Sequence, residues 1–571
     1  MANLNLNVKK KHKYDAIVIG SGASGGWAAK ELCDRGLKTL VLERGRGVKH
    51  IEEYPTASKA PWNFEFRGSV TNEQKKGFEM AKYMRAETLH WALPDDEQPI
   101  VQEKPFRWFR GYHEGGKSLL WARQTQRWSD YDYEGPDRDG FAVDWPIRYK
   151  DMSPWYDHVE KFAGIAGFND NLDALPNSIV QPGWDLNCVE QHFKETIEKV
   201  YKDRFLVFGR CAHLTDPQQI HYDQGRGRCV SQRQCNRGCN YGGYFSSNSS
   251  TLPWAAKTGK MTLRPHSVVH SIIYDEKKEK ATGVRVIDAT SHEMVEFYAK
   301  VIFVNGSAIN SNAILLNSTS TRFENGLGND AEVLGKYIAW HNYRGRISAR
   351  HSAFQDKKTS GAHPSHSYIP RFRNLYKQEE KFLRGYATGI GGGRGEYSPQ
   401  SGIGDELRNN LLSRELGGWN ISGWMMGETV PVAENHIRLH ETLKDKYGIP
   451  QIVFSCDWQE NDDKMVKDFT ETMTEMFEKA GFEDIKASDS HAAPGSDIHE
   501  MGGIRMGHDA KTSMLNRHNQ VHACKNIFVT DGACMTSTST QNPTLTYMAY
   551  AARAANFAAD ELNKKNLNPK K

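Results

Sequence analysis

The strongest constraint on the fold is a run of glycines that follows an apolar segment near the start of the chain. Tyr14–Gly20 reads YDAIVIG, a continuous apolar run that is typical of a buried parallel strand. The sequence continues through Gly22 and Gly25, then as WAAKELCDRG with helical spacing, and then as the apolar stretch KTLVLERG, which contains Glu43. This order of strand, glycine turn, helix and strand predicts a Rossmann-like unit that binds a dinucleotide.

Each glycine of such a unit, and the acid after its second strand, has its own physical role. Gly20 permits the tight turn after the strand, Gly22 lets the backbone approach a pyrophosphate, and Gly25 lets the helix pack closely on the strand. The N-terminus of the helix faces the phosphates, and Glu43 is expected to bind ribose hydroxyls. These residues alone do not distinguish NAD from FAD.

The end of the chain is predicted to return to the same sheet. Lys525–Asp531 reads KNIFVTD and is followed by Gly532, which again indicates a strand that ends in an acid. Asn542 and Pro543 then precede TLTYMAYAARAANFAADEL. An Asn N-cap followed by Pro at the first helical position is a strong helix start, and the positive end of this helix can stabilise an anion.

Together these motifs resemble those of the glucose–methanol–choline (GMC) flavoprotein oxidoreductases. Three segments between them agree: RGYHEGGKS resembles the Gly-Gly-Ser flavin loop, VIFVNGSAINSNAILLNS resembles the second signature of the family, and VLGKYIAWH resembles its G-x-N-x-x-D-H element, with Trp340 in place of the usual Asp. The segments follow the order of the family from residue 14 to residue 560, so the resemblance covers essentially the whole chain.

The resemblance implies an α/β fold in which a Rossmann-like FAD-binding domain is combined with a discontinuous α+β substrate domain built on an antiparallel sheet. The expected parts are an FAD-binding domain in residues 1–150, 205–340 and 495–571, an insertion or lid segment in 150–205, and a substrate domain in 340–495. Within them, the sequence predicts hairpin strands at Thr262–Asp275 and Ala281–Asp288 and a helix at Met465–Lys479.

The resemblance also implies how FAD is held. Some relatives attach the flavin to a histidine shortly after the Gly-Gly loop, and the matching place here, GKSLLW, has none. We therefore expect non-covalent FAD, with His113 as the one residue that could overturn this expectation. The expected contacts come from the glycine turn, the flavin loop, the strand ends and the last helix: Gly20, Gly22, Gly25, Glu43, Gly115, Gly116, Ser118, Val268, Gly306, Asp531, Gly532, Asn542, Pro543 and Thr544.

The catalytic residues implied by the resemblance are His499 and Asn542. In the family a histidine that precedes a G-x-x-R-M-G segment is the base beside the flavin, and His499 precedes GGIRMG here. A neutral imidazole titrates in the right range to take a hydroxyl proton while a hydride passes to flavin N5. The amide of Asn542 can hold the same oxygen without competing for its proton.

Three cysteines lie close together in a loop that is rich in glycine and arginine. Cys229, Cys235 and Cys239 have the spacing C-x5-C-x3-C, whereas a zinc site normally has four ligands in close pairs. Three thiolates can hold an iron–sulfur cluster, and this spacing resembles that of bacterial sugar dehydrogenases of the family, whose catalytic subunits carry a three-iron four-sulfur cluster. The alternative is a loop of packed, redox-silent cysteines. Four arginines of the loop are available to offset cluster charge: Arg226, Arg228, Arg233 and Arg237.

Within the family, the cysteine loop and the segment SHAAPGSDIHEMGGIRMG most resemble bacterial proteins similar to glucoside 3-dehydrogenase. The resemblance implies a dehydrogenase that oxidises a secondary alcohol of a sugar or glycoside, with the C3 hydroxyl of a pyranose as the expected position. It also implies a small partner subunit and a cytochrome as electron acceptor. An oxygen-using oxidase and a non-redox lyase on the same fold remain alternatives.

Charge and hydropathy exclude other classes of partner. The net charge of the 571 residues is +4, which is too small to favour nucleic acid as a partner. No window approaches the roughly 18 apolar residues of a transmembrane helix, and the start MANLNLNVKKKHKYD lacks the apolar core of a secretory signal peptide. We therefore expect the protein in the cytoplasm, or in the periplasm after co-export with a signal-bearing partner.

Overall fold

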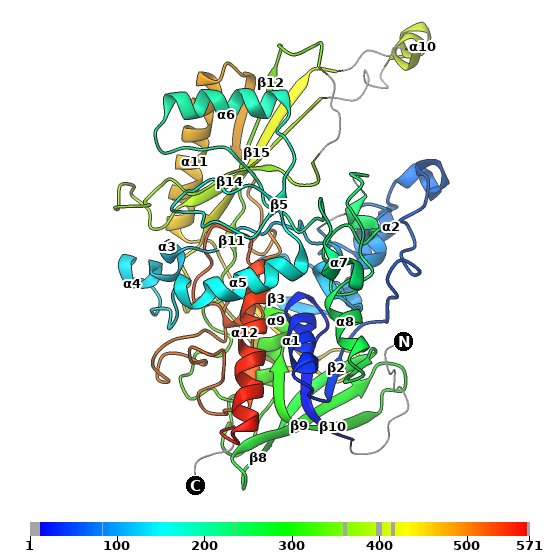
Figure 1. Ribbon diagram of the computed structural model, residues 1–571, viewed down its shortest axis with the longest axis vertical. Helices are drawn as coiled ribbons and strands as arrows, with labels where there is room; N and C mark the ends of the chain where they lie inside the picture. The colour runs from blue at the N-terminus through cyan, green and yellow to red at the C-terminus, as the bar shows by residue number, and fades with distance from the viewer. Residues whose placement is uncertain are drawn as a thin grey trace.

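The chain forms two large sheets, one in each half of the molecule. The computed structural model describes residues 12–82, 84–232, 234–357, 363–394, 402–412 and 417–567. Figure 1 shows one sheet, with β8, β9 and β10, in the lower half beside helices α1 and α12, and the other sheet, with β12, β14 and β15, in the upper half beside α6 and α11. The predicted combination of a parallel nucleotide-binding sheet with an antiparallel second sheet is confirmed.

The first sheet has the parallel core that the glycine motif predicts. Its order in the described residues is β7-β2-β1-β10-β9-β8, and β19 pairs with the second half of β10. Five strands run parallel: β7 (Met261–Arg264), β2 (Thr39–Leu42), β1 (His12–Ile19), β10 (Met294–Val304) and β19 (Ile527–Val529). The hairpin of β8 (Ser267–Asp275) and β9 (Lys280–Asp288) continues the sheet in antiparallel pairing.

The prediction of one strand over Thr262–Asp275 is wrong. The segment forms two strands, β7 beside β2 and β8 beside β9, and the chain turns between them at Pro265 and His266. Proline has no N–H to donate to a strand ladder, and His266 has a φ of 53°, in the left-handed region. The residues before this turn therefore extend the parallel core, and only the residues after it form the hairpin.

Helices α1 (Ala23–Asp34) and α12 (Thr544–Asn563) pack side by side against the first sheet (Figure 1). The predicted stripe of Leu545, Met548, Ala549 and Ala552 is buried in α12. The helix start is shifted by one residue from the prediction, because Pro543 is the N-cap and Asn542 lies before it without capping the helix. The side chain of Asn542 is thereby available for another contact.

The second sheet is antiparallel and is covered by two helices. Its order is β18-β12-β15-β14-β13-β6, with β11 on β15. Its strands are β18 (Glu483–Asp489), β12 (Gly345–His351), β15 (Trp419–Glu428), β14 (Tyr386–Arg394), β13 (Ser367–Ile369), β6 (Val207–Phe208) and β11 (His341–Asn342). Helix α11 (Glu460–Lys479) confirms the predicted helix, although it begins before Met465, and it buries Phe469 and Met473 against the sheet.

The segment 150–205, expected to be an insertion or lid, contributes to both halves. Helix α5 (Tyr149–Ala163) packs on α12, and its buried residues belong to the core of the first sheet. Helix α6 (Cys188–Val200) packs on β14 and belongs to the core of the second sheet. The segment thus joins the two halves through their cores.

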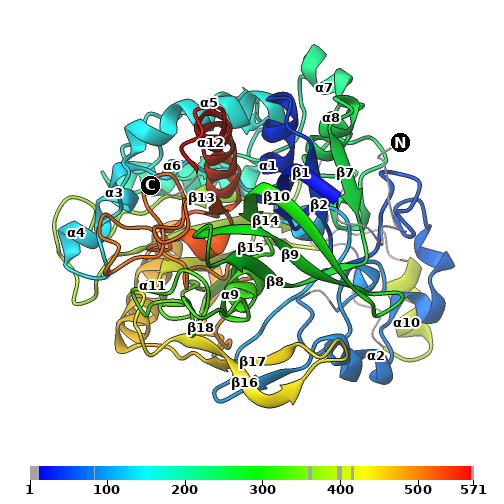
Figure 2. The ribbon, with the colours of Figure 1, turned by 90° about the horizontal axis from the view of Figure 1, so that it is seen from below.

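A smaller three-stranded sheet of β16 (His436–Lys444), β17 (Pro450–Ser455) and β3 (Ile100–Gln102) lies at the edge of the molecule (Figure 2). The remaining elements are short: β4 (Ala166–Gly167), β5 (Gln181–Pro182), α2 (Asn72–Gly77), α3 (Asp130–Tyr133), α4 (Gly135–Asp139), α7 (Gln219–Asp223), α8 (Thr251–Lys257), α9 (Ala308–Leu316) and α10 (Asp405–Leu412). Among the described residues, no helix combines the length and apolar character needed to cross a membrane.

Candidate active site

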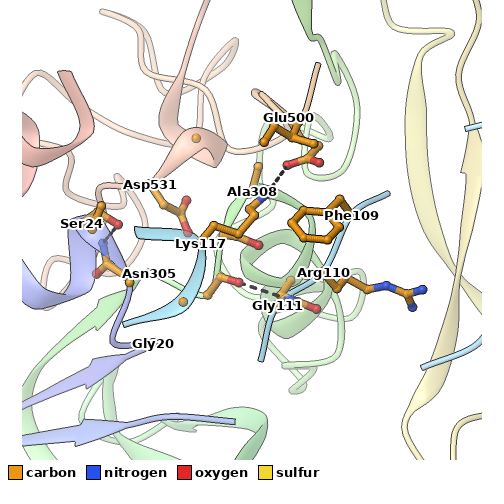
Figure 3. A pocket seen from close by; sticks show the side chains of 18 of the residues that line it. Gly20, Ser24, Phe109, Arg110, Gly111, Lys117, Asn305, Ala308, Glu500 and Asp531 are labelled. Carbon is orange, nitrogen blue, oxygen red and sulfur yellow. Dashed lines mark hydrogen bonds and ion pairs between the residues drawn. The ribbon is translucent and has the colours of Figure 1, made fainter. Parts of the chain in front are cut away.

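A cavity of about 450 Å³ is lined by residues from both sheets. The glycine turn, the ends of β1 and β2 and the start of α12 contribute from the first half, and β15 contributes Trp424 and Met426 from the second. Figure 3 shows Gly20 and Asn305 on one side of this cavity and Phe109 on the other, with Lys117 between them. The cavity is where the predicted cofactor and catalytic residues meet.

The glycine turn has the close contacts that its sequence requires. Gly20 has a φ of 95°, and a Cβ atom at this position would lie 2.3 Å from the carbonyl oxygen of Asn305. A Cβ atom at Gly25 would lie 2.0 Å from the carbonyl oxygen of Gly20, so helix α1 packs directly on the turn. Gly22 is the N-cap of α1 and provides no side-chain cap, which leaves amides of the first turn available at the cavity wall.

The acid at the end of β2 is tied to the same turn. Glu43 is buried and accepts hydrogen bonds from Oγ of Ser21 at 2.6 Å and from the backbone N–H of Gly45 at 2.9 Å. Burial raises the pKa of the Glu43 carboxyl, and these hydrogen bonds oppose the rise. The side chain lines the cavity, in the position from which it can exchange its bond to Ser21 for one to a ribose hydroxyl.

The predicted flavin loop docks on the glycine turn. Gly115 and Gly116 have φ values of 82° and 51°, and a Cβ atom at Gly116 would lie 3.4 Å from Cα of Gly22. The backbone N–H of Gly115 donates to Oγ of Ser21 at 2.9 Å, and Oγ of Ser118 donates to the carbonyl of Gly115 at 2.6 Å. A Cβ atom at Gly115 would lie 1.5 Å from Oδ1 of Asn248, so the glycines allow the two loops to pack closely at the cavity.

Most of the predicted cofactor residues line the cavity. Those that do are Gly20, Gly22, Glu43, Gly116, Ser118, Val268, Gly306, Asp531, Gly532, Asn542 and Thr544. Gly25, Gly115 and Pro543 are not among the lining residues and act through packing or backbone shape. His113 is also outside the lining, and its ring packs on Trp91 with 4.9 Å between the ring centroids. Uncapped helix amides and buried acids along one continuous cavity fit a dinucleotide such as FAD.

His499 and Asn542 meet at the wall of this cavity. Nδ2 of Asn542 donates to Nε2 of His499 at 3.3 Å, although the two residues are 43 positions apart. Burial lowers the pKa of His499 well below its ordinary value of 6.5, and the nearby His341, Lys82 and Lys117 lower it further. His499 is therefore neutral near pH 7, the form that can accept a proton.

A second histidine, which the sequence analysis missed, determines which nitrogen of His499 carries no proton. Nε2 of the buried His341 lies 3.1 Å from the carbonyl oxygen of Thr538, and its Nδ1 lies 2.9 Å from Nδ1 of His499. Because a carbonyl only accepts hydrogen bonds, the proton of His341 is on Nε2, and its Nδ1 accepts the Nδ1 proton of His499. The partners thus assign Nε2 of His499, at the cavity, as the nitrogen without a proton.

Asp497 lies beside both rings. Its Oδ2 accepts the backbone N–H of His341 at 2.8 Å and lies 3.7 Å from Nδ1 of His499. Burial raises the pKa of the Asp497 carboxyl to about 7. His341, Asp497 and His499 are also close enough together to be considered as a metal site. Among the described residues, their potential metal-binding atoms all lie within 4.8 Å of one another. Since both ring nitrogens of His341 already have partners, we interpret the group as a base with two positioning residues.

The three-cysteine loop forms a separate, small pocket. Cys229, Cys235 and Cys239 line it together with His213, whose Nε2 lies 3.7 Å from Sγ of Cys235. In the described part of the chain, the three sulfur atoms do not all lie within 4.8 Å of one another, as the ligand atoms of His341, Asp497 and His499 do. Sulfur ligands of one tetrahedral zinc would be about 3.8 Å apart, so the three thiols do not have the spacing of a single zinc site. Arg233, which was expected to offset cluster charge, lies outside the described residues.

The cysteine loop contacts the wall of the main cavity. Arg123 lines the cavity and donates from Nη1 to Oδ1 of Asn236 at 3.1 Å. Trp91, which packs on His113 of the flavin-loop segment, donates from Nε1 to the backbone carbonyl of Asn236 at 3.1 Å. Asn236 lies between Cys235 and Cys239, so a hydrogen bond connects the cysteine loop to Arg123 at the main cavity.

Two family models described as GMC oxidoreductase match the chain, one over residues 204–342 and the other over residues 431–551. The chain belongs to the GMC oxidoreductase family. It is therefore a flavoprotein that uses FAD and acts as an oxidoreductase on CH–OH groups. FAD is the dinucleotide of this family, which favours FAD over NAD at the glycine turn, although the turn lies outside the two matched ranges.

Several curated relatives extend over nearly the whole chain. The 2-methyl-1,2-propanediol dehydrogenase of Mycolicibacterium austroafricanum is 25% identical over 95% of this chain and 94% of its own. The fructose dehydrogenase large subunit of Gluconobacter japonicus is 24% identical over 96% of this chain and 98% of its own. The gluconate 2-dehydrogenase flavoprotein of Pantoea cypripedii is 24% identical over 93% and 91%. Two further relatives of similar identity and coverage are oxidases, paromamine 6'-oxidase of Streptomyces fradiae and 6'''-hydroxyparomomycin C oxidase of Streptomyces lividus.

Solved structures show the same fold. A variant of the formate oxidase of Aspergillus oryzae RIB40 has a TM-score of 0.61 and 12% identity, with 98% of this chain and 100% of that chain covered. A pyridoxine 4-oxidase has a TM-score of 0.58 and 14% identity, with 95% and 98% covered. At these identities the comparison establishes the GMC fold and leaves the substrate open.

Proposed function

We propose that this protein is a dehydrogenase that oxidises a secondary alcohol of a sugar or glycoside, with the C3 hydroxyl of a pyranose as the position of attack. The observation that carries the proposal is the unprotonated Nε2 of His499 beside the amide of Asn542 at the wall of the FAD cavity. The fructose dehydrogenase subunit and the gluconate 2-dehydrogenase flavoprotein among the relatives support a carbohydrate substrate.

In this mechanism FAD, bound non-covalently, supplies the acceptor of the hydride that leaves the carbinol carbon. When the substrate binds, the amide of Asn542 transfers its hydrogen bond from Nε2 of His499 to the substrate oxygen, and the hydroxyl proton then points to Nε2. His499 takes the proton while its own Nδ1 proton stays bonded to His341. The Asp497 carboxylate, 3.7 Å from Nδ1, stabilises the imidazolium that forms.

The second half of the molecule provides an aromatic wall for the sugar ring. Trp424 of β15 lines the cavity, and the ring of His366 packs on it with 4.3 Å between the centroids. Burial lowers the pKa of His366 to about 3, so this imidazole is neutral and can hydrogen-bond to hydroxyls. An aromatic face with a polar edge suits the apolar face and the hydroxyl rim of a pyranose.

Anaerobic titration of the purified holoenzyme tests the proposal. Sugars and glycosides are expected to bleach the oxidised flavin absorbance, and the product of a glucoside is expected to be its 3-keto derivative by NMR. If no carbohydrate bleaches the flavin absorbance, the sugar assignment is wrong. An oxygen-using oxidase would instead release peroxide in air at the rate of turnover, and a lyase would convert its substrate with no flavin reduction.

We further propose that the cysteine loop holds a three-iron four-sulfur cluster that carries electrons from FAD towards a small subunit and a cytochrome. Three observations support this role: the three thiols line one pocket, the N–H of Gly243 donates to Sγ of Cys239 at 3.3 Å, and Arg123 of the FAD cavity donates to Asn236 of the loop. The proposed location is the cytoplasm, or the periplasm after co-export with that partner; cell fractionation tests it.

The cluster predicts a metal content that can be measured without turnover. The aerobically purified protein is expected to contain roughly three iron atoms per FAD and to show an EPR signal when oxidised. Cys235→Ser is expected to lose iron and the signal while it keeps FAD, because the thiol is not part of the FAD cavity. Cys188→Ser, at the start of α6, is the matched control and should keep both cofactors. An iron-free wild type with full flavin content would rule the cluster out.

A further inference from the structure

A lysine at the wall of the catalytic cavity has no carboxylate partner of its own. Nζ of Lys82 donates to the backbone carbonyl of Ser496 at 2.8 Å and lies 4.6 Å from the centroid of the Tyr343 ring, and both Lys82 and Tyr343 line the cavity. The acids that act on Lys82 electrostatically are Asp497 and Glu500. In the described part of the chain no acid oxygen lies within 4 Å of Nζ of Lys82. Asp497 pairs instead with the two histidines, and Glu500 pairs with Lys117.

Two arginines behind Lys82 add to this positive charge. Cζ of Arg346, on β12, lies 4.1 Å from the Tyr343 ring centroid. Asp489, which acts on Arg346 electrostatically, is paired with Arg344. Arg107 is bonded to two backbone carbonyls and, within the described ranges, to no acid. Burial lowers the pKa of Lys82 to about 8, an effect that Asp497 opposes and the two arginines reinforce.

This excess of cations stands next to the catalytic base. Lys82 is among the groups that lower the pKa of His499, so the two lie within electrostatic reach of each other. A lysine ammonium has three donors, and its hydrogen bonds to the described residues use one of them, at the carbonyl of Ser496. The other two are available to the cavity, where a negatively charged group would both accept these hydrogen bonds and offset the charge of the arginines.

We propose that Lys82, backed by Arg346, binds a carboxylate of the substrate, so that the carbohydrate oxidised at His499 is an acidic one such as a uronate or an aldonate. The inference rests on the proposed function, because it presupposes that the alcohol belongs to a carbohydrate. It adds what that proposal leaves open, namely the group that fixes one end of the sugar while the hydroxyl faces His499. A neutral sugar would offer Lys82 only uncharged oxygens, which accept weaker hydrogen bonds than a carboxylate and leave the positive charge without an opposite charge.

Two glycosides that differ in one group test the inference. Methyl glucuronide and methyl glucoside share the pyranose ring and differ by a carboxylate in place of a hydroxymethyl group. In anaerobic flavin reduction by the wild-type holoenzyme, the half-saturating concentration is expected to be roughly tenfold to a hundredfold lower for the glucuronide, as a charge-assisted hydrogen bond provides. Lys82→Met should remove this preference, and Lys82→Arg should retain much of it. Lys76→Met, on exposed α2, is the matched control and should behave as wild type.

The possible failures are distinguishable. Equal half-saturation for the two glycosides, or an equal loss for both in Lys82→Met, overturns the carboxylate site and leaves the proposed function intact. A preference for glucose 6-phosphate over glucuronate also overturns it, because the site would then be one for phosphate. If no carbohydrate bleaches the flavin, the proposed function fails, and propionate, which carries no oxidisable hydroxyl, becomes the probe. Saturable perturbation of the flavin spectrum by propionate in wild type but not in Lys82→Gln supports the site, and no perturbation overturns it.

Discussion

Replacing His499 with alanine is expected to slow flavin reduction by roughly 10²–10⁴-fold. The variant loses the unprotonated Nε2 that receives the hydroxyl proton, while the glycine turn, the flavin loop and the start of α12 stay as they are. FAD is therefore expected to remain bound in the ratio found in the wild type. The measurements are the limiting rate of anaerobic flavin reduction by stopped flow and the flavin-to-protein ratio by absorbance.

The His499→Ala result has a specific control and a specific rescue. His508→Ala removes an exposed imidazole of the same segment, whose one ion partner is Asp144, and should leave the rate unchanged. Free imidazole, which fits the space left by the side chain, should restore part of the activity of His499→Ala and none of any activity lost through misfolding. A rate within about threefold of wild type in His499→Ala would show that another group accepts the proton.

The parts of the fold that the sequence predicts correctly are those determined by local requirements. The run Tyr14–Gly20 has to be a buried strand because it offers no polar face. Gly25 has to be a glycine because a Cβ atom there would lie 2.0 Å from the carbonyl oxygen of Gly20. The split between β7 and β8 was missed because the apolar pattern continues through Pro265 and His266. What separates the two strands is that β7 pairs with β2, a long-range contact that no local pattern records.

The active site likewise has residues that local motifs predict and contacts that only the folded chain brings together. The family resemblance predicts His499 and Asn542 as catalytic residues through their motifs, whereas the Asn-Pro pattern predicts Asn542 as a helix cap. In the structure Pro543 is the cap, and the amide of Asn542 bonds to His499. His341 stands at the end of the segment VLGKYIAWH, and its position after Trp340 was the one signal available. Its importance follows from a contact between residues 158 positions apart, and a sequence does not give the direction of a hydrogen bond between two rings.

Replacing His341 with leucine is expected to slow flavin reduction by roughly a hundredfold, without changing the FAD content or the half-saturating substrate concentration. In the wild type, His341 accepts the Nδ1 proton of His499 because its own Nε2 donates to Thr538. Leucine cannot accept a hydrogen bond, so the proton of His499 can move to Nε2. An imidazole with its proton on Nε2 cannot accept the hydroxyl proton at that nitrogen. The effect should be smaller than that of a permanently wrong tautomer, because the imidazole can still exchange its proton between the two nitrogens.

A positioning role for His341 makes a prediction that a packing role does not. His341→Asn keeps a polar oxygen near the place of Nδ1 and can still accept from His499, while it fills the buried space less well than leucine does. If His341 orients the proton of His499, the asparagine variant should recover most of the limiting rate that the leucine variant loses. If it only fills space, the better-packed leucine variant should be the more active and the more heat-stable of the two. The order of the two limiting rates, measured at saturating substrate, therefore decides whether the proton on His499 is held in place by its neighbour or left to exchange.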